Sequence, residues 1–189
     1  MAMGPIWLGF DFEQRKLTLY DDGSTEINVT TWEQCGRAMS GLVCLKELPD
    51  DESDADPTLS GFCNRPIYIS SFLLSQNDMF KSWKRVTGDK GEDWSVEQED
   101  SKERFNRRVA MMKTETARTV RIGAGMASFV RMFSAGGDGN YESQHQLHND
   151  SLGLPKESLD ERAKFARKLI DEGYAAKLFR RAVEGINEY

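Results

Sequence analysis

Arginine side chains are concentrated in the middle of the sequence, where they suit contact with phosphate groups. From Lys102 to Arg131 there are eight Lys and Arg residues and two Glu residues, an excess of six positive charges in a chain whose net charge is −6. The planar guanidinium donates two parallel hydrogen bonds to a phosphate. We therefore predict contact with RNA or single-stranded DNA, mostly independent of base sequence. The expected phosphate contacts are Arg107, Arg108, Arg118, Arg121 and Arg131.

A second basic group surrounds an aromatic ring in the sequence "FKSWKRV". An indole among cations suits stacking with an unpaired base. It equally suits the end of a helix, where cations offset the negative end of the helix dipole. The secondary nucleic-acid contacts are predicted to be Lys81, Trp83, Lys84 and Arg85.

Two other interpretations of the charge pattern remain open. A charged helix face is commonly solvated, or paired with acidic loops such as 47–56 and 89–100. Alternatively, the chain is a protein-binding module, an inhibitor or assembly factor that uses those loops or a C-terminal helical hairpin. The leading prediction is a non-enzymatic subunit of a larger assembly that contacts nucleic acid.

Residues for catalysis or metal binding are sparse. The two histidines, His145 and His148, are spaced to ligate a metal if their segment is helical, but no third ligand stands at a recognised spacing. A GxSxG nucleophile motif is absent. We therefore predict no enzyme activity, no catalytic residue, no metal and no cofactor, and keep a metal-dependent enzyme using these histidines as the weakest alternative.

The glycine-containing stretch 115–139 is predicted to be an amphipathic helix that ends in a glycine run. At about 100° per residue, Ile122, Met126, Phe129 and Phe133 share one face, which we expect to be buried. A phosphate-binding loop needs lysine and then Ser or Thr after its last glycine. Here Asn140 follows instead, which favours the helix.

The surrounding elements predict an α+β fold, with a small N-terminal antiparallel sheet followed by a mostly helical body. "PIWLGFDF" and "KLTLYDDG" alternate apolar and polar residues, which is typical of a hairpin, and "TEINVT" is expected to add a third strand. Capping residues and glycines limit the helices. Helices are predicted over 31–48, from 71 or 75 to 86, over 96–134 in one or two pieces, over 158–172, and from 174 to near the end.

Length and composition predict one domain over residues 1–189, with a possible subdivision into 1–70 and 71–189. No apolar run approaches the roughly 18 residues that span a bilayer, and the start "MAMGPIWLGF" lacks the pattern of a signal peptide. Cys35, Cys44 and Cys63 form no CxxC pair and are expected to be free thiols. These features predict a cytoplasmic phage or bacterial accessory protein with a protein partner or a second copy, and no membrane contact.

Overall fold

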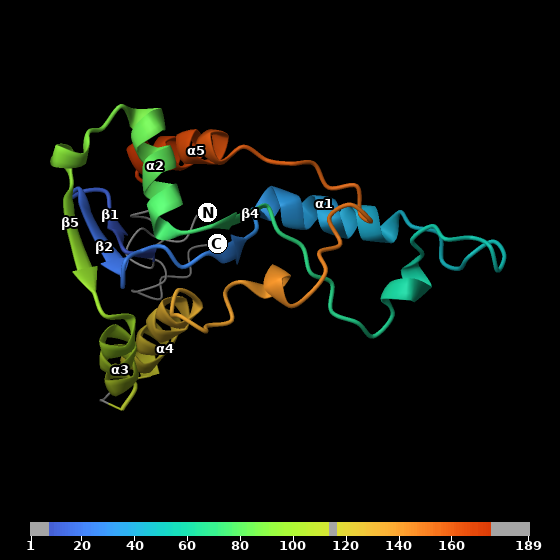
Figure 1. Ribbon diagram of the computed structural model, residues 1–189, viewed down its shortest axis with the longest axis horizontal. Coiled ribbons are helices and arrows are strands. Elements are labelled where there is room, and N and C mark those ends of the chain that lie inside the picture. Colours follow the sequence, from blue (N-terminus) through green and yellow to red (C-terminus); the bar gives the residue numbers. More distant parts are fainter. Residues whose placement is uncertain (1–7, 114–116, 175–189) are drawn as a thin grey trace. The chain divides into compact units, whose positions relative to one another are not determined.

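The computed structural model describes residues 8–113 and 117–174, which form an α+β protein, as predicted (Figure 1). The last predicted helix, beyond Tyr174, lies outside the described residues. In the part described, no helix combines the length and apolar character needed to cross a membrane. The strands are β1 (Phe10–Asp11), β2 (Lys16–Tyr20), β3 (Ile27–Val29), β4 (Phe72–Leu74) and β5 (Ser95–Glu99). The helices are α1 (Trp32–Val43), α2 (Gln76–Thr87), α3 (Ser101–Met111), α4 (Ala117–Met132) and α5 (Leu159–Asp171), with short 3₁₀ turns at Leu59–Phe62, Gly91–Asp93 and Tyr141–Ser143.

The chain forms two compact units. The first unit takes its described residues from the segments 1–27, 74–139 and 158–189, and the second takes them from 28–73 and 140–157. The sheet that contains β2, together with α2, α3, α4 and α5, belongs to the first unit. The predicted single domain, with its possible subdivision at residue 70, stays a prediction.

β2 is the central strand of the sheet in the first unit (Figure 1). It pairs with β1 as the predicted antiparallel hairpin, and with β5 in parallel, so that Thr18 lies opposite Glu97. The sheet is therefore mixed, and its third strand is β5 rather than "TEINVT", whose residues in β3 pair with β4. One physical reason is that the Gln76 side chain forms hydrogen bonds with Tyr20 N and Thr18 O. These backbone groups of β2 therefore already have partners and are not open to a further strand.

The core of the first unit follows from the alternation in "KLTLY". Leu17 and Leu19 are buried, as predicted for a half-buried strand. α2 packs against α5, and α3 against α4. Ser75 begins α2 with a capping box and Gly88 ends it in the left-handed conformation, close to the predicted limits.

The buried face of α4 is turned relative to the predicted one. Phe133, just after the helix, is buried as predicted, and Ala127 and Val130 are buried as well. Met126 and Phe129 are only half-buried, and the side chain of Ile122 lies outside the described residues. The helix turns this way because α3 approaches closely at Gly123. A Cβ there would lie 3.0 Å from Arg108 O.

The second unit is organised by polar contacts around its loops. Glu157 accepts hydrogen bonds from Thr31 Oγ1 at 2.7 Å and Ser71 Oγ at 2.5 Å. The predicted acidic loop 47–56 is gathered around Lys46, which pairs with Asp54. The hydrogen bond from Lys46 is the main cause that lowers the pKa of Asp54 to about 2. The loop is therefore partly ordered by its own charges.

Candidate functional site

A small apolar cavity lies in the first unit, among α2, α5 and the residues around β1. Its volume is about 80 Å³, which is room for a few small atoms or water molecules and is below the size of a complete cofactor site. It is lined by Leu8, Phe10, Phe12, Met79, Ser82, Trp83, Leu159, Arg162, Ala163 and Ala166. Because aromatic and aliphatic groups dominate the lining, the cavity suits the apolar part of an organic molecule.

Packed rings hold the aromatic side of the cavity in place. The ring centroids of Phe12 and Trp83 lie 4.3 Å apart, and Trp94 packs edge-on to Phe12 at 5.7 Å. Asp89 accepts hydrogen bonds from both indoles, at 3.1 Å from Trp83 Nε1 and 3.0 Å from Trp94 Nε1. Burial raises the pKa of Asp89, but these hydrogen bonds and one from Thr87 outweigh it, so that the pKa is lowered overall. The carboxylate therefore stays ionised and fixes both rings.

A polar bridge supports the cavity between α2 and α5. Asp160 Oδ1 accepts from Ser82 Oγ at 2.6 Å, and the carboxylate accepts from Arg85 at 2.6 Å and 3.0 Å. The hydrogen bond from Arg85, followed by that from Ser82, lowers the pKa of Asp160 to about 2. At neutral pH Asp160 is an acceptor only, so it orients Ser82 and does not supply a proton.

We expect Asp160→Asn to lower the thermal stability of the chain in a pH-dependent way. The pKa of Asp160 falls from 3.8 to about 2 on folding, so its stabilisation is present above about pH 4 and is lost as the pH falls through about 2. The difference in Tm between wild type and variant, measured by circular dichroism, should be largest near neutral pH and should vanish near pH 2.

Asp171→Asn is the matched control for this prediction. Asp171 pairs with Arg167 within the same helix, four residues away, and this pair does not join α5 to α2. Its Tm difference near neutral pH should be smaller. An equal loss in the two variants would contradict the assignment of Asp160 as the bridge between the helices.

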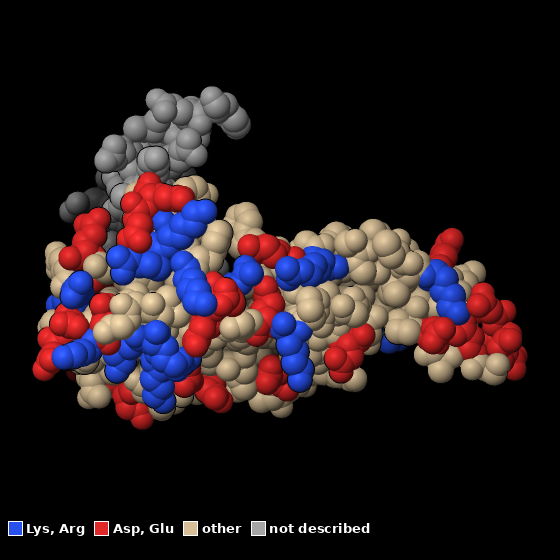
Figure 2. All heavy atoms as spheres, turned by 90° about the horizontal axis from the view of Figure 1, so that it is seen from above, with Lys and Arg blue, Asp and Glu red and all other residues tan. Residues whose placement is uncertain are grey.

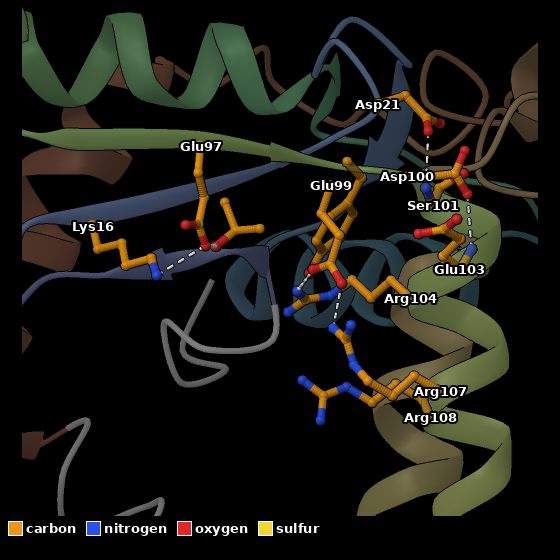
Figure 3. A network of polar contacts seen from close by, with 12 residues as sticks. Lys16, Asp21, Glu97, Glu99, Asp100, Ser101, Glu103, Arg104, Arg107 and Arg108 are labelled. Carbon is orange, nitrogen blue, oxygen red and sulfur yellow. Dashed lines mark hydrogen bonds and ion pairs between the residues drawn. The ribbon is translucent and has the colours of Figure 1, made fainter.

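The predicted arginines of α3 are drawn into a cluster with one glutamate (Figure 3). Glu99 at the end of β5 accepts from Arg104 Nη1 and from Arg107 Nη2. Arg104 is itself almost buried and lies over the ring of Tyr20, 4.9 Å from its centroid. The side chains of Arg118 and Arg121 lie outside the described residues. The structure therefore brings together Arg107 and Arg108, with Arg104 as an addition that the sequence did not single out.

The remaining predicted contacts are engaged within the protein. Trp83 is buried in the aromatic packing, where it lines the small cavity rather than the protein surface. Arg131 pairs with Asp138 at 3.1 Å, and Lys84 lies over the ring of Phe80. Lys81 lies 3.7 Å from Asp78, and Arg85 binds Asp160. On the face shown in Figure 2, basic and acidic residues are interspersed, rather than gathered into one continuous positive surface.

The two histidines contribute to packing in the second unit. His148 Nδ1 accepts from Tyr68 N at 3.1 Å, and the His145 ring stacks on Tyr68 with centroids 4.2 Å apart. Within residues 8–113 and 117–174, no three His, Cys, Asp or Glu residues are grouped so that they could hold a metal ion. Cys35, Cys44 and Cys63 are free, as predicted, and all three are exposed.

The chain is similar to a protein of Aspergillus flavus named "Oxidoreductase aprR". The two are 28% identical over 155 residues, which cover 82% of this chain and 46% of that protein. The chain thus spans about half the length of this relative. No protein-family model matches the chain, and no solved structure matches it.

This similarity contradicts the predicted function. The predictions of a non-enzymatic protein and of contact with RNA or single-stranded DNA are wrong, because the relative is an oxidoreductase. The physical error lay in the treatment of arginine spacing. Charges that are clustered in the sequence were assumed to share an open face, whereas Arg85, Arg107 and Arg131 each pair with a carboxylate.

The residues that line the apolar cavity were missed as a group. One signal was available in α5, where Leu159, Arg162, Ala163 and Ala166 follow the i, i+3, i+4, i+7 spacing of one helix face. Two alanines on such a face leave space against α2. That Phe10 and Phe12 meet this face follows only from the tertiary fold.

Proposed function

We propose that the chain is part of an oxidoreductase and that its cavity receives the apolar part of an organic substrate. The similarity to aprR over 82% of the chain carries this proposal. The cavity supports it, because packed rings fix its shape before a ligand arrives, which reduces the entropy lost on binding. Ser82 and Arg162 add polar groups to an otherwise apolar lining. Because the cavity of about 80 Å³ is smaller than the roughly 150 Å³ that holds benzene, the substrate is expected to combine a short alkyl group with a polar substituent.

A small aliphatic ketone and the matching alcohol provide the test of this function. The purified chain is titrated with butan-2-one and butan-2-ol, and tryptophan emission reports binding because Trp83 lines the cavity. The interconversion of the pair is then followed with nicotinamide and with flavin carriers, since such a carrier supplies the electrons in an oxidoreductase. Binding with interconversion is the expected result. A chain that binds neither compound and converts neither would contradict the proposal.

Filling the cavity should weaken ligand binding without unfolding the chain. We expect Ala166→Phe to weaken butan-2-one binding by about tenfold or more, because the new ring occupies the space of the ligand. Lys164→Phe adds the same ring to the same helix, on a side chain that is 60% exposed, and should leave the affinity within about twofold. Equal affinities for the two variants, measured by the same tryptophan titration, would place the ligand elsewhere.

The expected protein partner or second copy of the chain, and the expected cytoplasmic location, remain part of this proposal. An apolar stripe on α1 supports a partner, because Trp32, Met39 and Val43 are exposed at 79%, 61% and 65%. Three free and exposed cysteines suit a reducing compartment.

A further inference from the structure

Three guanidinium groups converge beside the sheet of the first unit, at a distinct set of residues from those that line the apolar cavity. Arg104, Arg107 and Arg108 follow the i, i+3, i+4 spacing on α3, so they share one helix face. Figure 3 shows all three side chains directed to the same side of the helix, toward the end of β5. We call these three residues the arginine cluster.

The arginine cluster carries more positive charge than its carboxylate neighbours offset. Glu99 is engaged with both Arg104 and Arg107. Glu97 pairs instead with Lys16 at 2.9 Å. Of the carboxylates labelled in Figure 3, Glu99 alone bonds to the arginine cluster, so three guanidinium groups share one direct carboxylate partner. Glu103 lies in the first turn of α3.

The other nearby carboxylates are held at the start of α3. Asp21 Oδ1 accepts from Ser101 N at 2.9 Å, and Asp100 Oδ1 accepts from Glu103 N at 2.8 Å. Their charges face the positive end of the helix dipole. Figure 3 shows them beside the first turn of α3, whereas Arg107 and Arg108 extend from further along the helix.

Two groups of the arginine cluster are buried without a matching acceptor. Within the described ranges, Nε of Arg104 and Nε of Arg108 are buried and have no hydrogen-bond partner. The Arg104 side chain is only 10% exposed. The polar contact of Arg108 is to the thioether sulfur of Met111, at 3.5 Å, which is a weak acceptor. The charge of Arg104 is paired with Glu99, whereas Arg108 has no strong acceptor among the described residues. Such a charge is costly to bury, so this arrangement favours an added anion beside Arg108.

We propose that the arginine cluster binds the phosphate group of a phosphate monoester. A monoester dianion brings two negative charges to three guanidinium groups that share one direct carboxylate partner, whereas a carboxylate or a phosphodiester brings one. Its three terminal oxygens also match the forked donors of several guanidiniums. This proposal does not depend on the proposed oxidoreductase function.

The ligand, and not the protein, should set the pH dependence of this binding. The second ionisation of a phosphate monoester lies near pH 6, and arginine stays charged throughout this range. Burial raises the pKa of Glu99, but hydrogen bonds from Arg104 and Arg107 outweigh it and lower the pKa overall. Burial raises the pKa of the Tyr20 hydroxyl. Neither group therefore titrates near pH 6, and the affinity for a monoester should rise between about pH 5 and pH 8.

Calorimetric titration of the full chain with methyl phosphate tests the site, with dimethyl phosphate and acetate as singly charged comparisons. Methyl phosphate should bind most tightly near pH 8 and more weakly near pH 5, while acetate should change little. Arg108→Gln should weaken methyl phosphate binding by about tenfold to a hundredfold, the effect of one charge-assisted contact. Arg107→Gln should also weaken methyl phosphate binding. Because this side chain is 56% exposed, the variant provides the same test if Arg108→Gln does not fold.

Arg85→Gln is the matched control, since it removes one arginine charge from the same unit at a side chain that is also 56% exposed. It should change the affinity by about twofold at most. The proposal is overturned if wild type binds no methyl phosphate, if acetate and dimethyl phosphate bind as tightly, or if Arg85→Gln weakens binding as much as the α3 variants.

Discussion

Replacing Gln76 with leucine is expected to lower the free energy of unfolding by about 3–5 kcal/mol. The side chain is fully buried and serves three backbone groups. Its Oε1 accepts from Tyr20 N at 2.7 Å, and its Nε2 donates to Leu8 O at 2.8 Å and to Thr18 O at 3.0 Å. Leucine has a similar volume but leaves these groups without partners, at a cost of about 1–3 kcal/mol for each buried group.

Urea denaturation measures this loss, and Asn77→Leu is its control. Asn77 is the next residue of α2 and donates one side-chain hydrogen bond, to Asp22 O at 3.0 Å, in an exposed setting. We expect it to cost about 1 kcal/mol or less. If both variants lose the same free energy of unfolding, the hydrogen bonds from Gln76 to the backbone do not stabilise the chain as we infer from its contacts.

Gly9→Ala is expected to destabilise the first unit by a comparable amount, about 3–5 kcal/mol. Two effects add at this position, which are the strain of a left-handed backbone conformation and the steric clash of the added Cβ. Gly9 has a φ of +87°, and an added Cβ would lie 2.2 Å from Thr18 O and 2.7 Å from Gln76 Nε2. Because Thr18 O belongs to the backbone of β2, the strand itself would have to move.

Gly88→Ala separates these two effects. Gly88 has a φ of +76° at the end of α2, but nothing lies within 4 Å of an added Cβ. Its cost should therefore be the conformational part alone, about 1–2 kcal/mol. Urea denaturation of both variants gives the steric part as the difference. A Gly9→Ala variant no less stable than Gly88→Ala would show that β1 and β2 can separate freely.

Local signals in the sequence were sufficient to predict most helix limits. Ser75 and Ser158 cap α2 and α5 because their hydroxyls accept from backbone N–H groups three residues on, an interaction encoded within one turn. β5 was predicted as part of an acidic loop and the start of a helix. Its sequence "SVEQE" has no buried alternation, since four of its five residues are exposed, and only pairing with β2 makes it a strand.

The candidate site depended on contacts that the sequence does not encode locally. Asp89 was assigned to an acidic loop, yet it accepts from two indoles. Asp160 was seen as one residue of a capped helix, yet its partners Ser82 and Arg85 lie 78 and 75 residues away. Such pairs form only after α2 and α5 are packed together. Charge counts along the chain therefore could not show that Arg85 pairs with Asp160.

The parallel pairing of β2 with β5 has a consequence for how the chain is made. Thr18 and Glu97, which face each other in the sheet, are separated by 79 residues. At roughly 5–20 residues per second, the ribosome takes about 4–16 s to deliver the partner strand. Until then β2 emerges with an open edge, which can pair with another nascent chain. Slower translation through residues 21–99 should thus increase aggregation during synthesis, and the yield of folded protein should depend on chaperones that bind the early hairpin.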